Sequence, residues 1–98
     1  MSDEKQTITI EYCRQCGWLL RAGWMAQELL NTFAEEIGGV TLVPGTGGIF
    51  EVRHGATVLW SRKERGRFPE ITELKQIVRD VVAPERRLGH TDRVKPAS

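Results

Sequence analysis

The sequence predicts a single α/β domain in which two helices pack on a four-stranded mixed sheet. Its 98 residues, with 40% hydrophobic and 28% charged side chains, have the size and composition of one soluble globular domain. Apolar residues gather in short runs typical of strands, and recur every three or four positions in two longer runs typical of helices. The order of these runs along the chain is β-α-β-β-β-α.

The first strand leads directly into the first helix. In residues 7–12 (TITIEY), three apolar side chains alternate with polar ones, which is the period of a strand. From residue 18 the apolar positions recur on one helical face, and the glycines at 38–39 are expected to end this helix. The core-facing positions of the helix are Leu19, Ala22, Ala26, Leu29 or Leu30, Phe33 and Ile37.

The remaining strands follow without another helix between them. Residues 40–44 (VTLVP) form a continuously apolar run, which suits a strand buried on both faces. Residues 49–53 and 56–61 indicate two strands joined through His54-Gly55 as an antiparallel hairpin. The first strand, the helix and the second strand form a crossover unit, so we expect a right-handed connection and parallel strands.

A second helix completes the domain. A basic connector at 62–68 precedes it, and Pro69 suits its first turn. Its apolar face is formed by Ile71, Leu74, Ile77, Val78, Val81 and Val82. The pattern stops after residue 83, and residues 84–98 are charged and hold two prolines. We therefore expect a domain over residues 1–83 and a flexible C-terminal tail over residues 84–98.

Whole-chain properties narrow the classes of function. The net charge of +1 provides no strong field that would attract nucleic acid or an anionic membrane. No apolar run approaches the roughly 18 residues of a membrane span, and the polar start MSDEKQT is unlike a signal or transit peptide. We expect a cytoplasmic protein that binds neither nucleic acid nor membrane.

The two cysteines of the chain, Cys13 and Cys16, lie where the first strand gives way to the first helix. Sites in open α/β folds form at such junctions. Free N–H groups and the dipole at a helix start favour the thiolate, which is the reactive form of cysteine. Arg14 and Arg21 add positive charge nearby. A CxxC pair in this position therefore indicates a dithiol/disulfide couple.

Two other interpretations of the cysteines remain open. Tetrahedral zinc needs four ligands, usually as two paired knuckles. A second CxxC is missing, and the histidines are His54, at the predicted hairpin, and His90, in the predicted tail. The other alternative is a pair of inert structural cysteines. The redox couple is the preferred interpretation, and we expect no metal and no further cofactor.

An ordered set of motifs over roughly residues 7–83 carries a family resemblance. These motifs are IEYCRQCGW, GTGGIFEV, VLWSRKERGRFPE and LKQIVRD. With them the chain resembles the bacterial, cysteine-containing branch of the selenoprotein W/T/H (Rdx) family. The resemblance implies a thioredoxin-like fold with the CxxC between strand one and helix one. It matches Cys16 to the selenocysteine position, whereas the helix-dipole argument favours Cys13 as the nucleophile, so both are assigned to redox catalysis.

Three further residues are predicted to bind substrate. Gly47 and Gly48 lie in a glycine-rich loop whose backbone groups suit a bound chain, although a plain turn is the alternative. Trp18, with Trp24 and Met25, lies partly off the apolar stripe and suits either a docking rim beside the dithiol or internal packing. The basic connector is most simply a solvated loop, or else a place for an anionic thiol such as glutathione.

Two functions follow from these observations. The first is thiol–disulfide exchange with glutathione or a client protein thiol, through a mixed disulfide, in cell redox homeostasis. The second is a redox-sensing module in which oxidation changes partner affinity with little turnover. Whether the protein is an enzyme, its redox partner, its reduction potential and its oligomeric state are not specified by the sequence.

Overall fold

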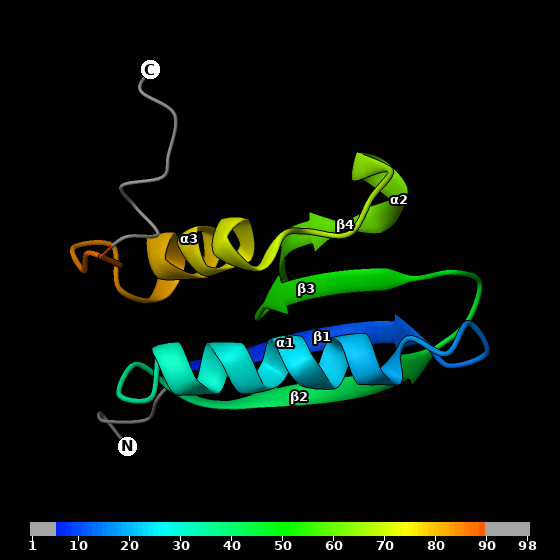
Figure 1. Cartoon of the computed structure of the whole chain (residues 1–98), viewed down its shortest axis with the longest axis horizontal. Helices are drawn as coiled ribbons and strands as arrows, with labels where there is room; N and C mark the ends of the chain where they lie inside the picture. Colours follow the sequence, from blue (N-terminus) through cyan, green and yellow to red (C-terminus); the bar gives the residue numbers. More distant parts are fainter. Residues whose placement is uncertain (1–5, 90–98) are drawn as a thin grey trace.

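A four-stranded mixed sheet carries the fold, and the computed structural model describes it over residues 6–89 (Figure 1). The elements in order are β1 (Gln6–Cys13), α1 (Leu19–Thr32), β2 (Ile37–Gly45), β3 (Phe50–His54), β4 (Thr57–Ser61), α2 (Arg62–Arg65) and α3 (Ile71–Val82). The sheet order is β2-β1-β3-β4, with β1 parallel to β2 and the other neighbours antiparallel. The predicted fold class and strand pattern are confirmed.

Strand register brings two loops to the same end of the sheet. Cys13, the last residue of β1, pairs with Gly45, the last residue of β2. Tyr12 pairs with Phe50, the first residue of β3. The loop after β1 (residues 14–18, here the redox loop) and the loop after β2 (residues 46–49, here the glycine loop) therefore emerge together, at the right of Figure 1.

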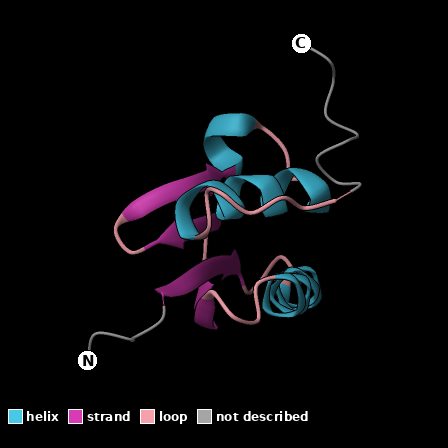
Figure 2. Ribbon diagram, turned by 90° about the vertical axis from the view of Figure 1, so that its left-hand side faces the viewer, coloured by secondary structure: helices cyan, strands magenta, loops and turns pink. Residues whose placement is uncertain are grey.

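The core lies on one face of the sheet. Ile8 and Ile10 of β1 are fully buried there, whereas Thr7, Thr9 and Glu11, which alternate with them, are not. Both long helices cover this face (Figure 2). The remaining buried apolar members of the core are Tyr12, Ala22, Met25, Ala26, Leu29, Phe33, Ile37, Phe50, Val52, Trp60, Leu74, Val78 and Val82. On the other face, Arg53 bonds the carboxylates of Glu11 and Glu51 at 3.0 Å, and the bond to Glu11 raises the pKa of Arg53.

The structure corrects the prediction that the second strand is buried on both faces. β2 is an edge strand, and after its buried first residue, Ile37, its residues are exposed or only partly buried. Because the helices cover one face only, the other side of β2 contacts no second layer. The apolar run at residues 40–44 reflects packing of Val40 and Leu42 against the core, without full burial of the strand.

The first helix ends earlier than its apolar periodicity predicts. α1 stops at Thr32, and residues 33–36 form turns in which Phe33 accepts a bond from the N–H of Ile37 at 3.0 Å. Ile37 begins β2, and the register shift beside it places the glycines of 38–39 at a bulge. Glycine inside a strand often marks such a bulge. These glycines therefore serve the strand and do not terminate the helix.

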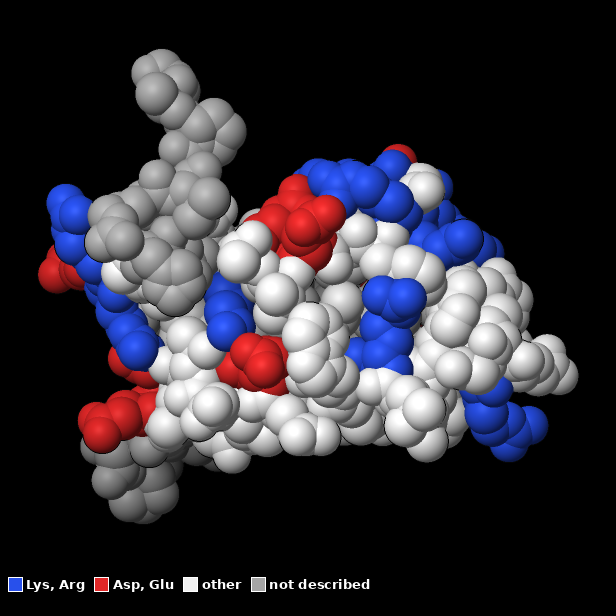
Figure 3. Space-filling model, viewed as in Figure 1, with Lys and Arg blue, Asp and Glu red and all other residues white. Residues whose placement is uncertain are grey.

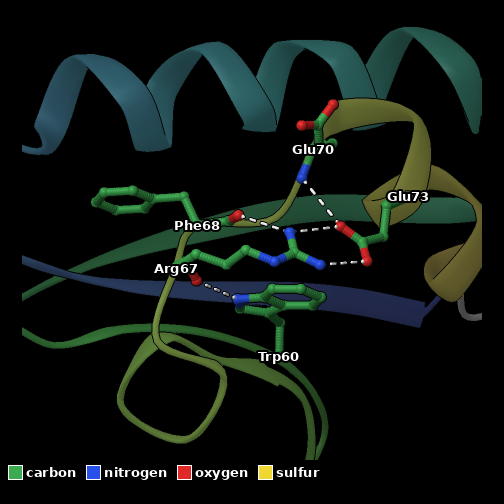
Figure 4. Close-up of polar contacts among 5 residues, drawn as sticks. All are labelled: Trp60, Arg67, Phe68, Glu70 and Glu73. Atoms are coloured by element: carbon green, nitrogen blue, oxygen red, sulfur yellow. Dashed lines mark hydrogen bonds and ion pairs between the residues drawn. The ribbon is translucent and has the colours of Figure 1, made fainter.

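The basic connector contains a single helical turn. Ser61 caps α2 by accepting a bond from the N–H of Glu64 at 3.4 Å, and Gly66, with φ of +77°, ends it. Trp60 Nε1 then donates to the carbonyl oxygen of Arg67 at 3.0 Å, and both terminal nitrogens of Arg67 bond Glu73 at 3.0 Å (Figure 4). This network fixes the chain between β4 and α3.

The chain after α3 continues to contact the domain. Arg86 bonds Glu36 at 2.9 Å, and Leu88 packs against the core. The rest of the predicted tail, including His90, lies outside the described residues, so the boundary at residue 83 stays a prediction. Within residues 6–89, no helix is long and apolar enough to cross a bilayer.

Candidate functional site

The CxxC motif forms a disulfide at the end of β1. Cys13 and Cys16 are bonded, with Cα atoms 5.3 Å apart, inside the usual range for such a bridge. Between them and α1 the chain turns sharply: the N–H of Gly17 donates to Arg14 at 3.1 Å, and Gly17 has φ of +77°. A positive φ is easily adopted by glycine alone, so Gly17 permits the turn by which the chain passes from Cys16 into α1.

The two cysteines differ in exposure. Cys13, the last residue of β1, keeps only 1% of its surface exposed. Cys16 lies in the redox loop and is exposed. The helix-dipole argument favoured Cys13 as the nucleophile, but Cys13 is the less accessible of the two cysteines. A partner thiol therefore meets Cys16 first.

The end of β2 closes against the redox loop. The N–H of Arg14 donates to the carbonyl oxygen of Gly45 at 3.0 Å. A Cβ atom at residue 45 would lie 2.8 Å from Cγ2 of Ile49 and 2.9 Å from Oε2 of Glu11, so a side chain there would collide. Sequence reasoning did not single out Gly45, because its neighbours come from two other segments and only the sheet register brings them close.

The glycine loop lies at the same end of the sheet as the redox loop. Gly47 and Gly48 have φ of +71° and +74°, and a Cβ atom at either would touch nothing within 4 Å. The backbone conformation explains why glycine occupies these two positions, and no close approach of another group requires it. Their predicted role in substrate binding stays a prediction.

Three aromatic rings, one of them from the redox loop, pack against one another. We call Trp18, Phe50 and Phe68 the aromatic cluster. The ring centroids of Trp18 and Phe68 are 4.8 Å apart, those of Phe50 and Phe68 5.1 Å, and those of Trp18 and Phe50 6.4 Å, all edge to face. This geometry is favourable for aromatic pairs. Trp18 is therefore partly packed inside the domain, and its predicted contact with substrate stays a prediction.

Two guanidinium groups lie on the aromatic cluster. Arg21 is 4.1 Å from the ring centre of Phe68, and Arg62 is 4.9 Å from that of Trp18 and 5.2 Å from that of Phe68. The Nε atom of Arg62 is buried and has no hydrogen-bond partner. Positive charge is thus held beside the redox loop and favours anionic sulfur or an anionic partner.

The first turns of α1 expose apolar side chains next to Cys16. Leu19, Leu20 and Trp24 are 49%, 85% and 46% exposed. The prediction that Leu19 faces the core is therefore wrong, because the buried face of α1 is centred on Ala22, Met25, Ala26 and Leu29. Met25, considered earlier as a rim residue, belongs to that buried face.

His54, which was considered as a possible metal ligand, lies far from the cysteines. His54 pairs with Ile8 near the start of β1, five residues before Cys13, which is about 16 Å of extended strand. Its ring bonds the side chain of Gln6. Within residues 6–89, no three His, Cys, Asp or Glu side chains gather where they could hold a metal ion.

Comparisons with known proteins point to one family. The profile of the Rdx family matches residues 7–80. A crystal structure of a selenoprotein W-related protein from Vibrio cholerae is similar, with 53% identity, a TM-score of 0.77, and coverage of 81% of this chain and 99% of that one. A structure from Bordetella parapertussis has 56% identity and a TM-score of 0.76, covering 79% and 98%. No match was found among curated proteins.

Proposed function

Since the chain belongs to the Rdx family, we propose that it is a small thiol–disulfide redox protein whose Cys13–Cys16 couple exchanges with thiols of other molecules. The observation that carries the proposal is the pairing of one buried and one exposed cysteine in a single disulfide. An exposed sulfur can be attacked from outside, and a buried neighbour can resolve the resulting adduct.

Reduction of the protein begins at Cys16. An incoming thiolate attacks Sγ of Cys16, the Cys13–Cys16 bond breaks, and Cys13 leaves as a thiolate that takes up a proton. A second thiolate then attacks the sulfur of the incoming molecule in the mixed disulfide and releases Cys16. Two electrons pass to the protein, and two external thiols become one disulfide. The reverse sequence reduces a client disulfide, and the two potentials decide the direction.

The surroundings of Cys16 support two kinds of partner thiol. Glutathione is anionic and suits the charge of Arg21 and Arg62. A client protein thiol suits the exposed apolar start of α1, which offers more contact area than a tripeptide needs. The exchange requires neither a metal nor another cofactor, and nucleic acid and membrane are not among the partners we propose.

Single cysteine variants test the exchange. Substoichiometric protein should accelerate reduction of a disulfide substrate by a thiol, and Cys16→Ser should abolish this activity because the accessible sulfur is lost. Cys13→Ser should form a mixed disulfide with substrate that mass spectrometry detects on Cys16. Turnover that survives in both single variants would overturn the proposal.

A redox-sensing module is the second candidate. The redox loop joins the disulfide to the aromatic cluster through Trp18, so breaking the disulfide frees one anchor of a loop that packs against Phe68. Pull-down of partners by the oxidised and the reduced protein tests this role. A redox-dependent partner profile without turnover would favour sensing, and identical profiles would exclude it.

A further inference from the structure

The cations of this protein divide into those paired with a carboxylate and those without one. Ion pairs occupy Arg53, Arg67, Lys75, Arg79 and Arg86. Within residues 6–89, further cations have no ion pair. Five of them lie in the redox loop, in α1 and in α2, and we call these five the basic surface: Arg14, Arg21, Arg62, Lys63 and Arg65.

Aromatic rings hold three members of the basic surface: the aromatic cluster holds Arg21 and Arg62, and Trp60 holds Arg65. Arg21 and Arg62 lie over one ring, that of Phe68, although they come from α1 and α2. Lys63 and Arg65 follow in α2, and Arg65 lies 4.3 Å from the ring centre of Trp60. Figure 3 shows blue atoms gathered over α2, at the upper right of the molecule. Glu64 is the acid within the same turn, so the surface remains strongly positive.

Gathering these cations is electrostatically unfavourable for the protein alone. Two like charges repel one another above the ring of Phe68, and the buried Nε of Arg62 lacks an acceptor. Rings attract guanidinium groups but supply no counter-charge. Carboxylates of a partner, bonding the outer guanidinium nitrogens, would provide that counter-charge.

The apolar start of α1 adds a second recognition element. Leu20 and Trp24 stand one helical turn apart in α1, on either side of Arg21 in the sequence, and are 85% and 46% exposed. One partner that lies across the redox loop and the start of α1 would therefore meet an exposed sulfur, positive charge and apolar side chains. This combination suits a polypeptide.

Nucleic acid fits this surface less well, although it also seeks basic and aromatic residues. Bases bind single-stranded-nucleic-acid proteins by stacking on open ring faces. Here Phe50 is fully buried, Phe68 is covered by Arg21, and Trp18 packs edge to face against both phenylalanines. The rings hold the arginines in place and leave little face for a base.

We infer that the redox loop docks a client protein segment in which the reacting cysteine is flanked by Asp or Glu and followed by an apolar side chain. This inference rests on the proposed thiol–disulfide function and names its substrate class. The carboxylates bind the basic surface and the apolar side chain contacts Leu20 and Trp24, which places the client sulfur at Cys16.

Peptide disulfides of opposite charge test the inference. Two synthetic peptides carry one cysteine and one leucine, with Glu on both sides of the cysteine in the first and Lys at the same places in the second. Each is oxidised to its symmetric disulfide. The reduced full-length protein then converts one peptide disulfide into two peptide thiols and becomes oxidised at Cys13 and Cys16. The second-order rate constant is measured at low and high NaCl.

We expect the acidic peptide to react at least about tenfold faster at low salt, and we expect the ratio to approach one in about 1 M NaCl, where the Debye length is roughly 3 Å. Arg21→Gln should lower the ratio severalfold. Arg14→Gln should do so as well, and within residues 6–89 the exposed Arg14 side chain makes no ring contact or ion pair whose loss would unfold the protein. Leu20→Ser should slow the acidic peptide without changing the salt dependence.

A matched control removes the same charge elsewhere. Arg87 is an exposed cation without an ion pair within residues 6–89. It belongs to the segment that follows α3, which Figure 1 shows at the end of the molecule away from the redox loop, and Arg87→Gln should leave the ratio unchanged. Equal rates for the two peptides, or an equal loss with Arg87→Gln, would overturn the inference. Oxidised glutathione that depends on Arg14 and Arg21 as strongly as the acidic peptide would also overturn it, in favour of a small anionic thiol.

An uncharged substrate separates this inference from the proposed function. If the reduced protein fails to react with 2-hydroxyethyl disulfide and with both peptides, the redox function itself fails. If it reacts with 2-hydroxyethyl disulfide and shows no preference between the peptides, the redox function stands and the docking inference fails.

Discussion

The two ends of the sheet differ in how they balance charge. At the end that carries the dithiol, Arg21 and Arg62 lie over aromatic rings and have no carboxylate partner within residues 6–89. At the opposite end, Arg86 is paired with Glu36, across the segments that follow α3 and α1. Ion pairs within a chain add modest stability, whereas unpaired cations held by rings remain available to a partner. The comparison separates an end whose arginine is paired within the chain from an end whose arginines lack a carboxylate partner within residues 6–89.

Two phenylalanines, one at each end, give the largest expected effect. Phe50 belongs to the aromatic cluster and Phe33 follows α1, and both are fully buried. Phe50→Ala and Phe33→Ala should each lower the free energy of unfolding by about 3–5 kcal/mol, because each leaves a cavity. Urea denaturation measures this. Among the folded molecules, only Phe50→Ala should alter the rate of thiol exchange, and an equal change in Phe33→Ala would remove the functional distinction between the ends.

Two glycines of β2 sharpen the comparison at an intermediate scale. A Cβ atom at Gly45 collides with Ile49 and Glu11, whereas a Cβ atom at Gly39, near the other end of the strand, touches nothing within 4 Å. Gly45→Ala should therefore lower the free energy of unfolding by about 1–3 kcal/mol through overpacking. Gly39→Ala is the matched control and should change the urea midpoint far less. Equal losses in the two variants would show that the close approach at Gly45 is relieved without cost.

The smallest effect concerns Glu73 and the pH dependence of stability. The hydrogen bonds from Arg67 lower the pKa of Glu73 below its ordinary value of 4.5. Because the pKa is lower in the folded protein, the stabilisation is present above pH 4.5 and is lost as the pH falls through the folded-state pKa. Glu73→Gln should therefore reduce the urea midpoint at pH 6, and by less at pH 3. A variant that loses the same amount at both values would assign Glu73 a role other than charge pairing.

Periodicity predicted the order and type of the main elements, because each strand and helix shows its own spacing of apolar residues. It failed where neighbours distant in sequence decide the outcome. Ile37 continues the helical stripe of α1 but begins β2, because the parallel ladder with β1 includes it. Leu19 also fits the stripe, yet the buried face of α1 turns it toward solvent. The residues 40–44 are apolar, yet their strand lies at an edge.

In the candidate site, too, local features were predictable from the sequence and features that depend on distant neighbours were not. Cys13 and Cys16 are close in sequence, and a turn of four residues is enough to bring them within bonding distance, so local pattern predicted their pairing as a redox couple. Their unequal exposure was not predictable in this way, because burial of Cys13 depends on the strands and helices around the end of β1. Gly45 escaped notice for the same reason.

The chain by itself determined a CxxC pair at a strand-to-helix junction and the β-α-β-β-β-α order, since both depend on residues within a few positions of one another. Only the tertiary structure decided which sulfur faces solvent. It also decided that rings from three segments pack together and that arginines from α1 and α2 lie over one ring. The physical reason is that exposure and charge balance are sums over all neighbours in space, and a linear pattern records only those along the chain.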